Sequence, residues 1–213
     1  MTETVVVPAT EEHFDAVASV LAPRGGNLNC WCLYWRLSAG DFTRCRGTDR
    51  SDTMRRLTAS HPAPGVVAYV DGEPAGWLAL GPRADMGRLV RSRTIPVVDD
   101  RPVWSVVCFL VRPGYRRQGL TQHLLRGAIA YARKQRAPAL EAYPVDTGGG
   151  RIHTGAAYVG TLGMFTDAGF EVVTTTAATS GRLPRLVVRL DLDRALTKDR
   201  AVTKAGRRSG GSA

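Results

Sequence analysis

Apolar residues recur along the chain with two different periods, and these periods divide it into expected strands and helices. Continuous or alternating apolar runs favour strands at 4–7, 66–70, 75–80, 103–111, 139–143 and 184–190. Apolar residues three or four positions apart predict helices at about 10–21, 52–60, 120–136 and 156–168. Residues 23–50 are rich in glycine and aromatic residues, so we expect mostly loop with a short helical piece.

The order of these elements predicts an α/β (α+β) fold, a mixed and mostly antiparallel sheet with helices on both faces. The strands at 66–70 and 75–80 flank Asp71–Gly72–Glu73–Pro74, a turn with glycine where a positive φ is needed, so we expect a hairpin. The segment 103–143 has the order strand, helix, strand. Its two strands should therefore be parallel neighbours in a central βαβ unit.

Composition and charge indicate one folded domain followed by a basic tail. A length of 213 residues with 44% hydrophobic residues suits a single domain, which we expect to span 1–193. The net charge is +10, and +5 of it lies in 194–213, where six Arg/Lys stand against one aspartate. We expect this tail to be disordered, with a polyanion-binding arm as the alternative. The absence of a secretory signal and of a long apolar run predicts a soluble, cytoplasmic protein.

The four cysteines are candidates for metal binding, but their spacing argues against it. Without a secretion signal, disulfides are not expected. Cys30, Cys32, Cys45 and His61 would supply four zinc ligands, yet C-x-C is not the usual spacing of a zinc pair. Cys108 lies inside an apolar run and is interpreted as a small core residue. We therefore expect no metal site.

The junction between the apolar strand and the helix at 120–136 carries the clearest chemical signal. The first turn of a helix leaves about four backbone N–H groups without partners, and acidic residues nearby are normally favourable. Here the stretch from Arg112 to Arg136 contains seven Arg/Lys and no Asp or Glu. Backbone donors ringed by arginines, with Gly119 allowing close approach, are typical of a phosphate site. The alternative is a helix start with surplus surface arginines.

The run V-R-P-G-Y-R-R-Q-G-L-T at 111–121 resembles motif A of the GNAT superfamily of acyl-CoA-dependent N-acetyltransferases. Arg116 matches the first motif position and Gly119 the central glycine, whereas Thr121 replaces the usual small residue. The resemblance extends through Ala168–Gly169–Phe170, and the element order fits from about 4 to 190. It implies acetyl-CoA as co-substrate and direct transfer of the acetyl group to a primary amine of a small molecule or a protein.

The resemblance also implies which residues hold coenzyme A. The backbone of the strand before the loop would bind pantetheine through Phe109, Leu110 and Val111. The loop and the first helical turn would bind the pyrophosphate through Arg116, Arg117, Gln118, Gly119, Leu120, Thr121 and Gln122. A backbone N–H of the strand would stabilise the oxyanion.

Catalytic residues are harder to assign. Alternation with Val111 places Ser105, Val107 and Phe109 on the inward face of the strand, with no carboxylate or imidazole among them. Ser105 could act through a water relay, and Asp146 or His153 could act as a base from nearby, although a solvated loop aspartate is the alternative for Asp146.

The tyrosine acid that many relatives carry corresponds here to Phe165. Tyr158, about two turns earlier on the same expected helix, is the substitute, with a packed core tyrosine as the alternative. Trp31, Tyr34 and Trp35 are candidates for the acceptor site, because their rings suit an apolar or cationic amine, or else they cover the sheet as core.

Two other functions remain open at this level. A non-catalytic acyl-CoA-binding or sensor module would explain the missing carboxylate and imidazole. A nucleic-acid-binding protein would use the arginines and the tail, but only Tyr115 interleaves with the basic run as a stacking residue. The resemblance favours the enzyme, and the sequence does not indicate the oligomeric state.

Overall fold

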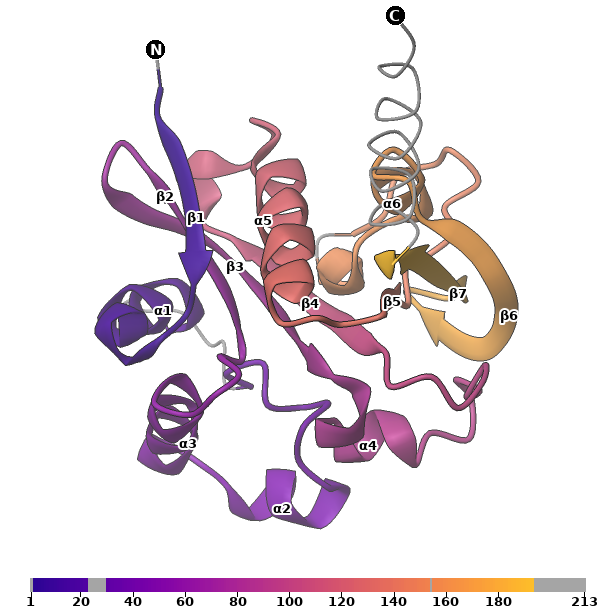
Figure 1. Cartoon of the computed structure of the whole chain (residues 1–213), viewed down its shortest axis with the longest axis horizontal. Helices are drawn as coiled ribbons and strands as arrows, with labels where there is room; N and C mark the ends of the chain where they lie inside the picture. The colour runs from indigo at the N-terminus through magenta and orange to yellow at the C-terminus, as the bar shows by residue number, and fades with distance from the viewer. Residues whose placement is uncertain (1, 23–29, 154, 194–213) are drawn as a thin grey trace, which may run out of the picture.

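The computed structural model describes residues 2–22, 30–153 and 155–193 of the 213-residue chain. The expected disordered tail at 194–213 and part of the expected loop at 23–50 lie outside the described residues. The elements form one seven-stranded sheet, ordered β1-β2-β3-β4-β5-β7-β6, with helices on both faces (Figure 1). Only β4 and β5 are parallel neighbours in the described sheet, so the predicted fold class and the central βαβ unit are confirmed.

The six predicted strands are present, with bounds that differ from the apolar runs by one or two residues at an end. The strands of the sheet are β1 (Thr4–Pro8), β2 (Gly65–Val70), β3 (Glu73–Pro82), β4 (Trp104–Val111), β5 (Ala139–Ala142), β6 (Glu171–Ser180) and β7 (Leu183–Asp191). The helices are α1 (Phe14–Leu21), α2 (Ala39–Arg44), α3 (Thr48–Thr58), α4 (Gly87–Val90), α5 (Leu120–Lys134) and α6 (Leu162–Thr166). The turn between β2 and β3 has Gly72 at φ 82°, which confirms the predicted hairpin.

Two apolar layers cover the sheet. On one face, α5 buries its leucine and alanine stripe against side chains of β2, β3 and β4, and in Figure 1 it lies across these strands. On the other face, α1 and the segment from Cys32 to Trp35 pack against Trp77 of β3 and Cys108 of β4. Strands β2, β3, β4 and β5 are therefore buried on both faces for most of their length.

A bulge in β4 changes which of its residues share a face. The register with β3 runs from Ala79 opposite Cys108 to Leu80 opposite Val106, so Val107 is the additional residue. Val107 and Cys108 both join the layer that contains α1, whereas Val106 and Phe109 both join the layer under α5. The prediction that Ser105 and Val107 share a face with Phe109 and Val111 is therefore wrong, because simple alternation does not hold across a bulge.

β4 and β5 pair along only part of β4. Their register ends at Val106 opposite Ala142, while β4 continues to Val111. Beyond this point the chain after β5 bridges to Thr161 and Arg185 through Val145, away from β4. One edge of β4 from Val107 onward consequently has no strand partner among the described residues.

The carboxy-terminal part differs from the prediction in two ways. The expected helix at 156–168 is divided into a 3₁₀ turn, Ala157–Val159, and the short α6, because Gly160 between them adopts φ 80° and Thr161 bridges to Val145. Gly169 has φ 87°, as expected for the residue after a helix. Strand β6 was not predicted, and it pairs with β7 as a hairpin.

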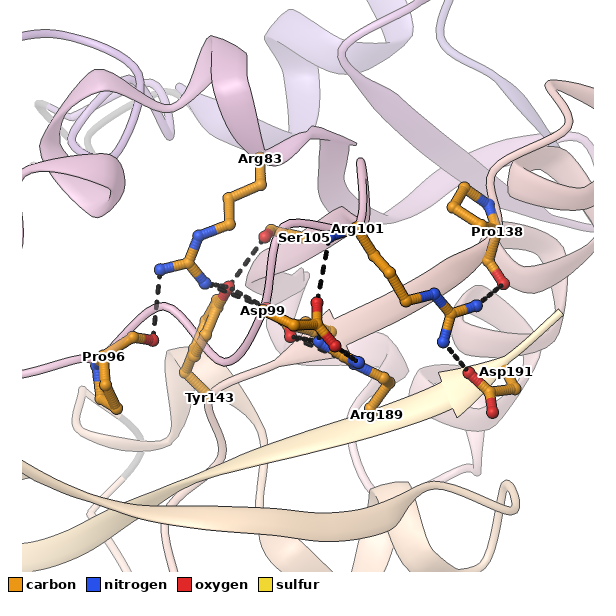
Figure 2. A network of polar contacts seen from close by, with 10 residues as sticks. Arg83, Pro96, Asp99, Arg101, Ser105, Pro138, Tyr143, Arg189 and Asp191 are labelled. Atoms are coloured by element: carbon orange, nitrogen blue, oxygen red, sulfur yellow. Dashed lines mark hydrogen bonds and ion pairs between the residues drawn. The ribbon is translucent and has the colours of Figure 1, made fainter.

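A buried polar network ties the far half of the sheet to the segment between β3 and β4 (Figure 2). Glu141 of β5, 1% exposed, accepts hydrogen bonds from Arg83 at 2.9 Å and from Arg189 of β7 at 2.6 Å. Arg83 also donates to the Tyr143 hydroxyl, and Arg189 pairs with Asp99. Two buried or half-buried cations are thereby neutralised around one buried carboxylate.

Candidate functional site

The amino-terminal end of α5 is a row of unpartnered backbone donors. Among the described residues, the N–H groups of Arg117, Gln118, Gly119, Leu120 and Thr121 have no acceptor, and the first one that does is Gln122, which donates to the Gly119 carbonyl at 2.9 Å. Gly119 occupies the N-cap position without a side-chain cap, and the first turn contains no acidic residue. Neither a carboxylate nor a hydroxyl of the described chain fills this corner.

The conformation of the loop aims these donors outward. Arg117 and Gly119 adopt left-handed φ values of 61° and 76°, which turn successive N–H groups toward a common side as in an anion-binding nest. A Cβ at Gly119 would meet no atom within 4 Å, so the space over the glycine is open. Arg116 holds the loop to the end of β4, because its Nε donates to the Val111 carbonyl at 3.0 Å. The arrangement suits a diphosphate.

A cleft of about 730 Å³ starts at this loop and runs along β4. At one end it is lined by Arg116, Arg117, Gly119, Leu120 and Thr121, and along its length by Phe109, Leu110 and Val111. The cleft therefore follows the edge of β4 that has no strand partner. Eight of the ten residues expected to hold coenzyme A line this one cavity.

Gln118 and Gln122 are not among the lining residues. Their side-chain amides donate within the protein, Gln118 to the Gly114 carbonyl and Gln122 to the Met164 carbonyl. The Gln122 main-chain N–H is already committed to the helix. These two residues stabilise the loop and join α5 to α6.

The other end of the cleft carries the aromatic residues that the sequence nominates for the acceptor. Trp31, Tyr34 and Trp35 all line it, together with Tyr158 from the 3₁₀ turn. Trp35 is buried, whereas Tyr34 is 40% exposed at the mouth. Segments more than 100 residues apart in sequence thus form one wall.

Three thiols also line the cleft, and no function was predicted for them there. Cys30, Cys32 and Cys108 are lining residues, with the sulfurs of Cys32 and Cys108 3.0 Å apart. Hydrogen bonding to Cys108 and burial raise the pKa of Cys32, and hydrogen bonding to Cys32 and burial raise that of Cys30. Cys30 and Cys32 are therefore poor nucleophiles. The C-W-C run at 30–32 had drawn attention to two of these cysteines as zinc ligands, whereas Cys108 had been interpreted as a core residue.

The structure separates the nominated catalytic residues. Tyr158 lines the cleft, and burial raises its pKa, so its hydroxyl stays protonated at neutral pH. Ser105 is fully buried on the other face from Phe109 and is 2.8 Å from the Tyr143 hydroxyl within the polar network of Figure 2. Asp146 caps its own turn by accepting from the Gly148 N–H. Neither Ser105 nor Asp146 lines the cleft.

The positions around Tyr158 also differ from the expectation. Tyr158 is not on the same helix as Phe165, because Gly160 separates the two elements. Phe165 is fully buried and packs edge-to-face against Phe109 and Phe170. His153 accepts a hydrogen bond from the Gly155 N–H and is not a lining residue.

The described residues include no group of three or more histidine, cysteine, aspartate or glutamate side chains placed to hold a metal ion. Within the same part of the chain, no helix combines the length and the apolar character needed to cross a membrane.

Comparison with known proteins places this geometry in a family. The model of the acetyltransferase (GNAT) family matches residues 31–149, more than half of the chain. The match includes both the aromatic segment at 31–35 and the loop at the start of α5. No curated protein matches the chain by sequence.

Solved structures share the fold at low identity. One described as an acetyltransferase is 17% identical, with a TM-score of 0.54 over 88% of this chain and 99% of that chain. An N-acetyltransferase from Staphylococcus aureus Mu50 is 14% identical, with a TM-score of 0.53 over 89% and 99%. A chain of the NatC complex bound to a Gag peptide and CoA is 13% identical, with a TM-score of 0.51 over 89% and 98%. A longer protein from Kribbella flavida is matched over 34% of its length.

Proposed function

The chain belongs to the GNAT family of acetyltransferases and is an acyltransferase. We propose that it moves an acetyl group from acetyl-CoA directly to a primary amine of a small molecule or a protein. The observation that carries the proposal is the row of five N–H groups, Arg117 to Thr121, without acceptors at the start of α5. Charge-assisted hydrogen bonds from such groups are the strongest that a main chain can offer a phosphate.

In this proposal the co-substrate lies along the cleft. The pyrophosphate binds the five N–H groups and the guanidinium groups of Arg116 and Arg117. The pantetheine arm follows the unpartnered edge of β4 from Val111 toward Phe109, where it can pair with the main chain like an added strand. The thioester is then directed toward the aromatic end of the cleft.

The chemistry is a direct displacement at the thioester. The lone pair of the neutral amine attacks the carbonyl carbon, and the resulting oxyanion is stabilised by a main-chain N–H of β4. The C–S bond then breaks and the electron pair leaves on sulfur. Tyr158 donates its proton to the departing thiolate. The ammonium group loses its proton to solvent, and solvent returns a proton to Tyr158. Trp31, Tyr34 and Trp35 hold the acceptor in this proposal, with no metal involved.

A cytoplasmic location accompanies the proposal. Its support is that all four cysteines are free and that acetyl-CoA is an intracellular metabolite.

The test is calorimetric titration of the full chain with acetyl-CoA. Gly119→Glu should abolish binding, because a side chain and a negative charge then occupy the phosphate corner. The matched control is Gly72→Glu, since Gly72 also has a positive φ, of 82°, and open space around it, but lies in the turn between β2 and β3 outside the cleft. It should bind acetyl-CoA like the wild type. No binding by the wild type at millimolar ligand would reject the proposal.

A further inference from the structure

Arg185 of β7 is a buried cation without a carboxylate. The residue is 4% exposed, and its Nε donates to the Tyr143 carbonyl at 2.9 Å. Its Nη2 is buried and has no hydrogen-bond partner among the described residues. Burial lowers the pKa of the guanidinium, but arginine remains charged in proteins. A buried charge of this kind is unfavourable unless something pairs with it.

Two other arginines near Arg185 do have carboxylate partners. Arg189, four residues further along β7, pairs with Glu141 and Asp99, and the buried Arg83 also pairs with Glu141. No ion pair to Arg185 is present in the described part of the chain. The fold supplies counter-ions to two of these arginines and leaves the third without one.

The unpaired guanidinium lies directly behind the acceptor end of the cleft. Its central carbon is 5.3 Å from the centre of the Trp35 ring, and Tyr158 and Tyr34 are near enough to influence its pKa. These three aromatic residues line the cleft. Trp35 has a second unsatisfied donor, because its indole Nε1 is also buried without a hydrogen-bond partner among the described residues. Two buried, unsatisfied donors therefore lie at or behind one cavity wall: Trp35 is a lining residue, and Arg185, which is not, packs against its ring.

The remaining lining agrees with a ligand that is apolar and negatively charged. Among the described lining residues there is no aspartate or glutamate, so no carboxylate there would pair with an ammonium group. Most of the other lining side chains at this end are aromatic rings and thiols. The surroundings favour an acceptor whose amine is neutral when it reacts and whose charge, where it has one, is negative.

We propose that Arg185, assisted by the Trp35 indole N–H, binds a carboxylate of the acceptor, so that the substrate is a primary amine with an apolar body and a carboxylate group. This rests on the proposed function, because it names the substrate class of the same cleft. Arg185 is a specificity residue here, and the reacting atoms remain those described above.

The experiment compares two probes that differ only in charge. 3-Phenylpropionate and 3-phenylpropionamide are titrated calorimetrically into the full chain, with and without saturating CoA. The wild type should bind the carboxylate at least about tenfold more tightly, as expected for a charge-assisted hydrogen bond to a desolvated guanidinium. Equal affinities, or no binding of either probe up to about 10 mM, would overturn the proposal.

Substitutions test whether the Arg185 side chain causes the preference for the carboxylate probe. Arg185→Met should remove the preference for the carboxylate, and Arg185→Lys should keep part of it. Trp35→Phe, which keeps the ring but loses the donor, should weaken carboxylate binding by a smaller factor. The matched control is Arg182→Met, because Arg182 is exposed and lies at the turn of the same hairpin, so the net charge falls equally. It should keep the preference.

Circular dichroism and CoA affinity establish that each variant is folded. If Arg185→Met does not fold, the wild-type comparison and Trp35→Phe decide. Displacement of 3-phenylpropionate by equimolar inorganic phosphate would indicate a general anion site and overturn the assignment to an acceptor carboxylate.

Measurements of turnover distinguish the proposed carboxylate site from the proposed acetyl transfer. With acetyl-CoA as donor, phenylalanine should be acetylated with a higher kcat/KM than phenylalaninamide, measured by chromatography of the product. Acetylation of both at the same kcat/KM would overturn only the carboxylate site. Carboxylate preference in a protein that binds no acetyl-CoA would overturn only the proposed function.

Discussion

At the scale of single residues, the proposed reaction uses Tyr158 as the proton donor of the cleft. Its described lining contains tyrosines and thiols but no carboxylate or imidazole, so no residue there is a conventional general base. The attacking amine must therefore lose its proton before it enters or pass it to water. Tyr158 can serve the other half of the reaction, because burial raises its pKa and keeps the hydroxyl protonated.

Replacing this hydroxyl tests its role. Tyr158→Phe should lower kcat about 10²-fold, the lower end of what a general acid contributes, and leave the Kd of acetyl-CoA unchanged. The reason is that the phenyl ring still fills the wall while the thiolate must leave unprotonated. Steady-state kinetics with a fixed amine measures the first quantity and calorimetry the second. Tyr115→Phe, at the phosphate end of the cleft, serves as the control and should retain kcat. A Tyr158→Phe enzyme with unchanged kcat would assign Tyr158 to packing.

At the scale of elements, the sequence predicted the helices and strands whose apolar residues recur with the period of the face that they bury. The helix at 120–136 and the strand at 103–111 have strong apolar periods, and α5 and β4 match them closely. β6 was missed because most of its ten residues are exposed or half-exposed and polar, which leaves no apolar alternation to detect. The helix at 156–168 was over-extended because the positive φ of Gly160 depends on a bridge from Val145, a contact made by tertiary structure.

The network around Glu141 joins β5 and β7 to the segment between β3 and β4. Glu141→Ala should lower the free energy of unfolding by about 3–5 kcal/mol, because Arg83 and Arg189 lose their shared buried counter-ion. Urea denaturation followed by circular dichroism measures this loss.

The control for this prediction is Asp99→Asn, which removes an exposed carboxylate that also pairs with Arg189. It should cost much less, since exposed ion pairs contribute little. A loss for Glu141→Ala no greater than that of the control would contradict the view that the network holds β5 and β7 to the segment before β4.

At the scale of the whole molecule, the cleft is made by three segments whose association the sequence could not predict. The candidate phosphate loop could be proposed from the sequence because its charge pattern is local. Trp31, Tyr34 and Trp35 were nominated only through the resemblance, since nothing in their spacing specifies which strand they cover. The bulge at Val107 then moved Ser105 to the other face, and a one-residue insertion of this kind leaves no periodic signal.

The burial of ionisable cysteine and tyrosine side chains makes the fold less stable at high pH. Hydrogen bonding and burial raise the pKa of Cys30 and Cys32 above the ordinary value of 9.0, and burial raises that of Tyr143 above 10.0. Below pH 9 these groups are protonated in both states, so their contribution to stability is complete. As the pH rises further, the unfolded chain loses these protons first, and the free energy of unfolding should fall by up to about 1.4 kcal/mol per pH unit for each group.

Urea denaturation at intervals from pH 8 to about pH 11 measures this decline, and one variant isolates a single contributor. Tyr143→Phe should be less stable at every pH, because Ser105, Glu141 and Arg83 lose a hydrogen-bonding partner. Above about pH 10, however, its stability should fall less steeply than that of the wild type, since one ionising group has been removed. Parallel curves for the two proteins would mean that the Tyr143 hydroxyl ionises as readily in the fold as outside it, and that the network around it does not exclude water.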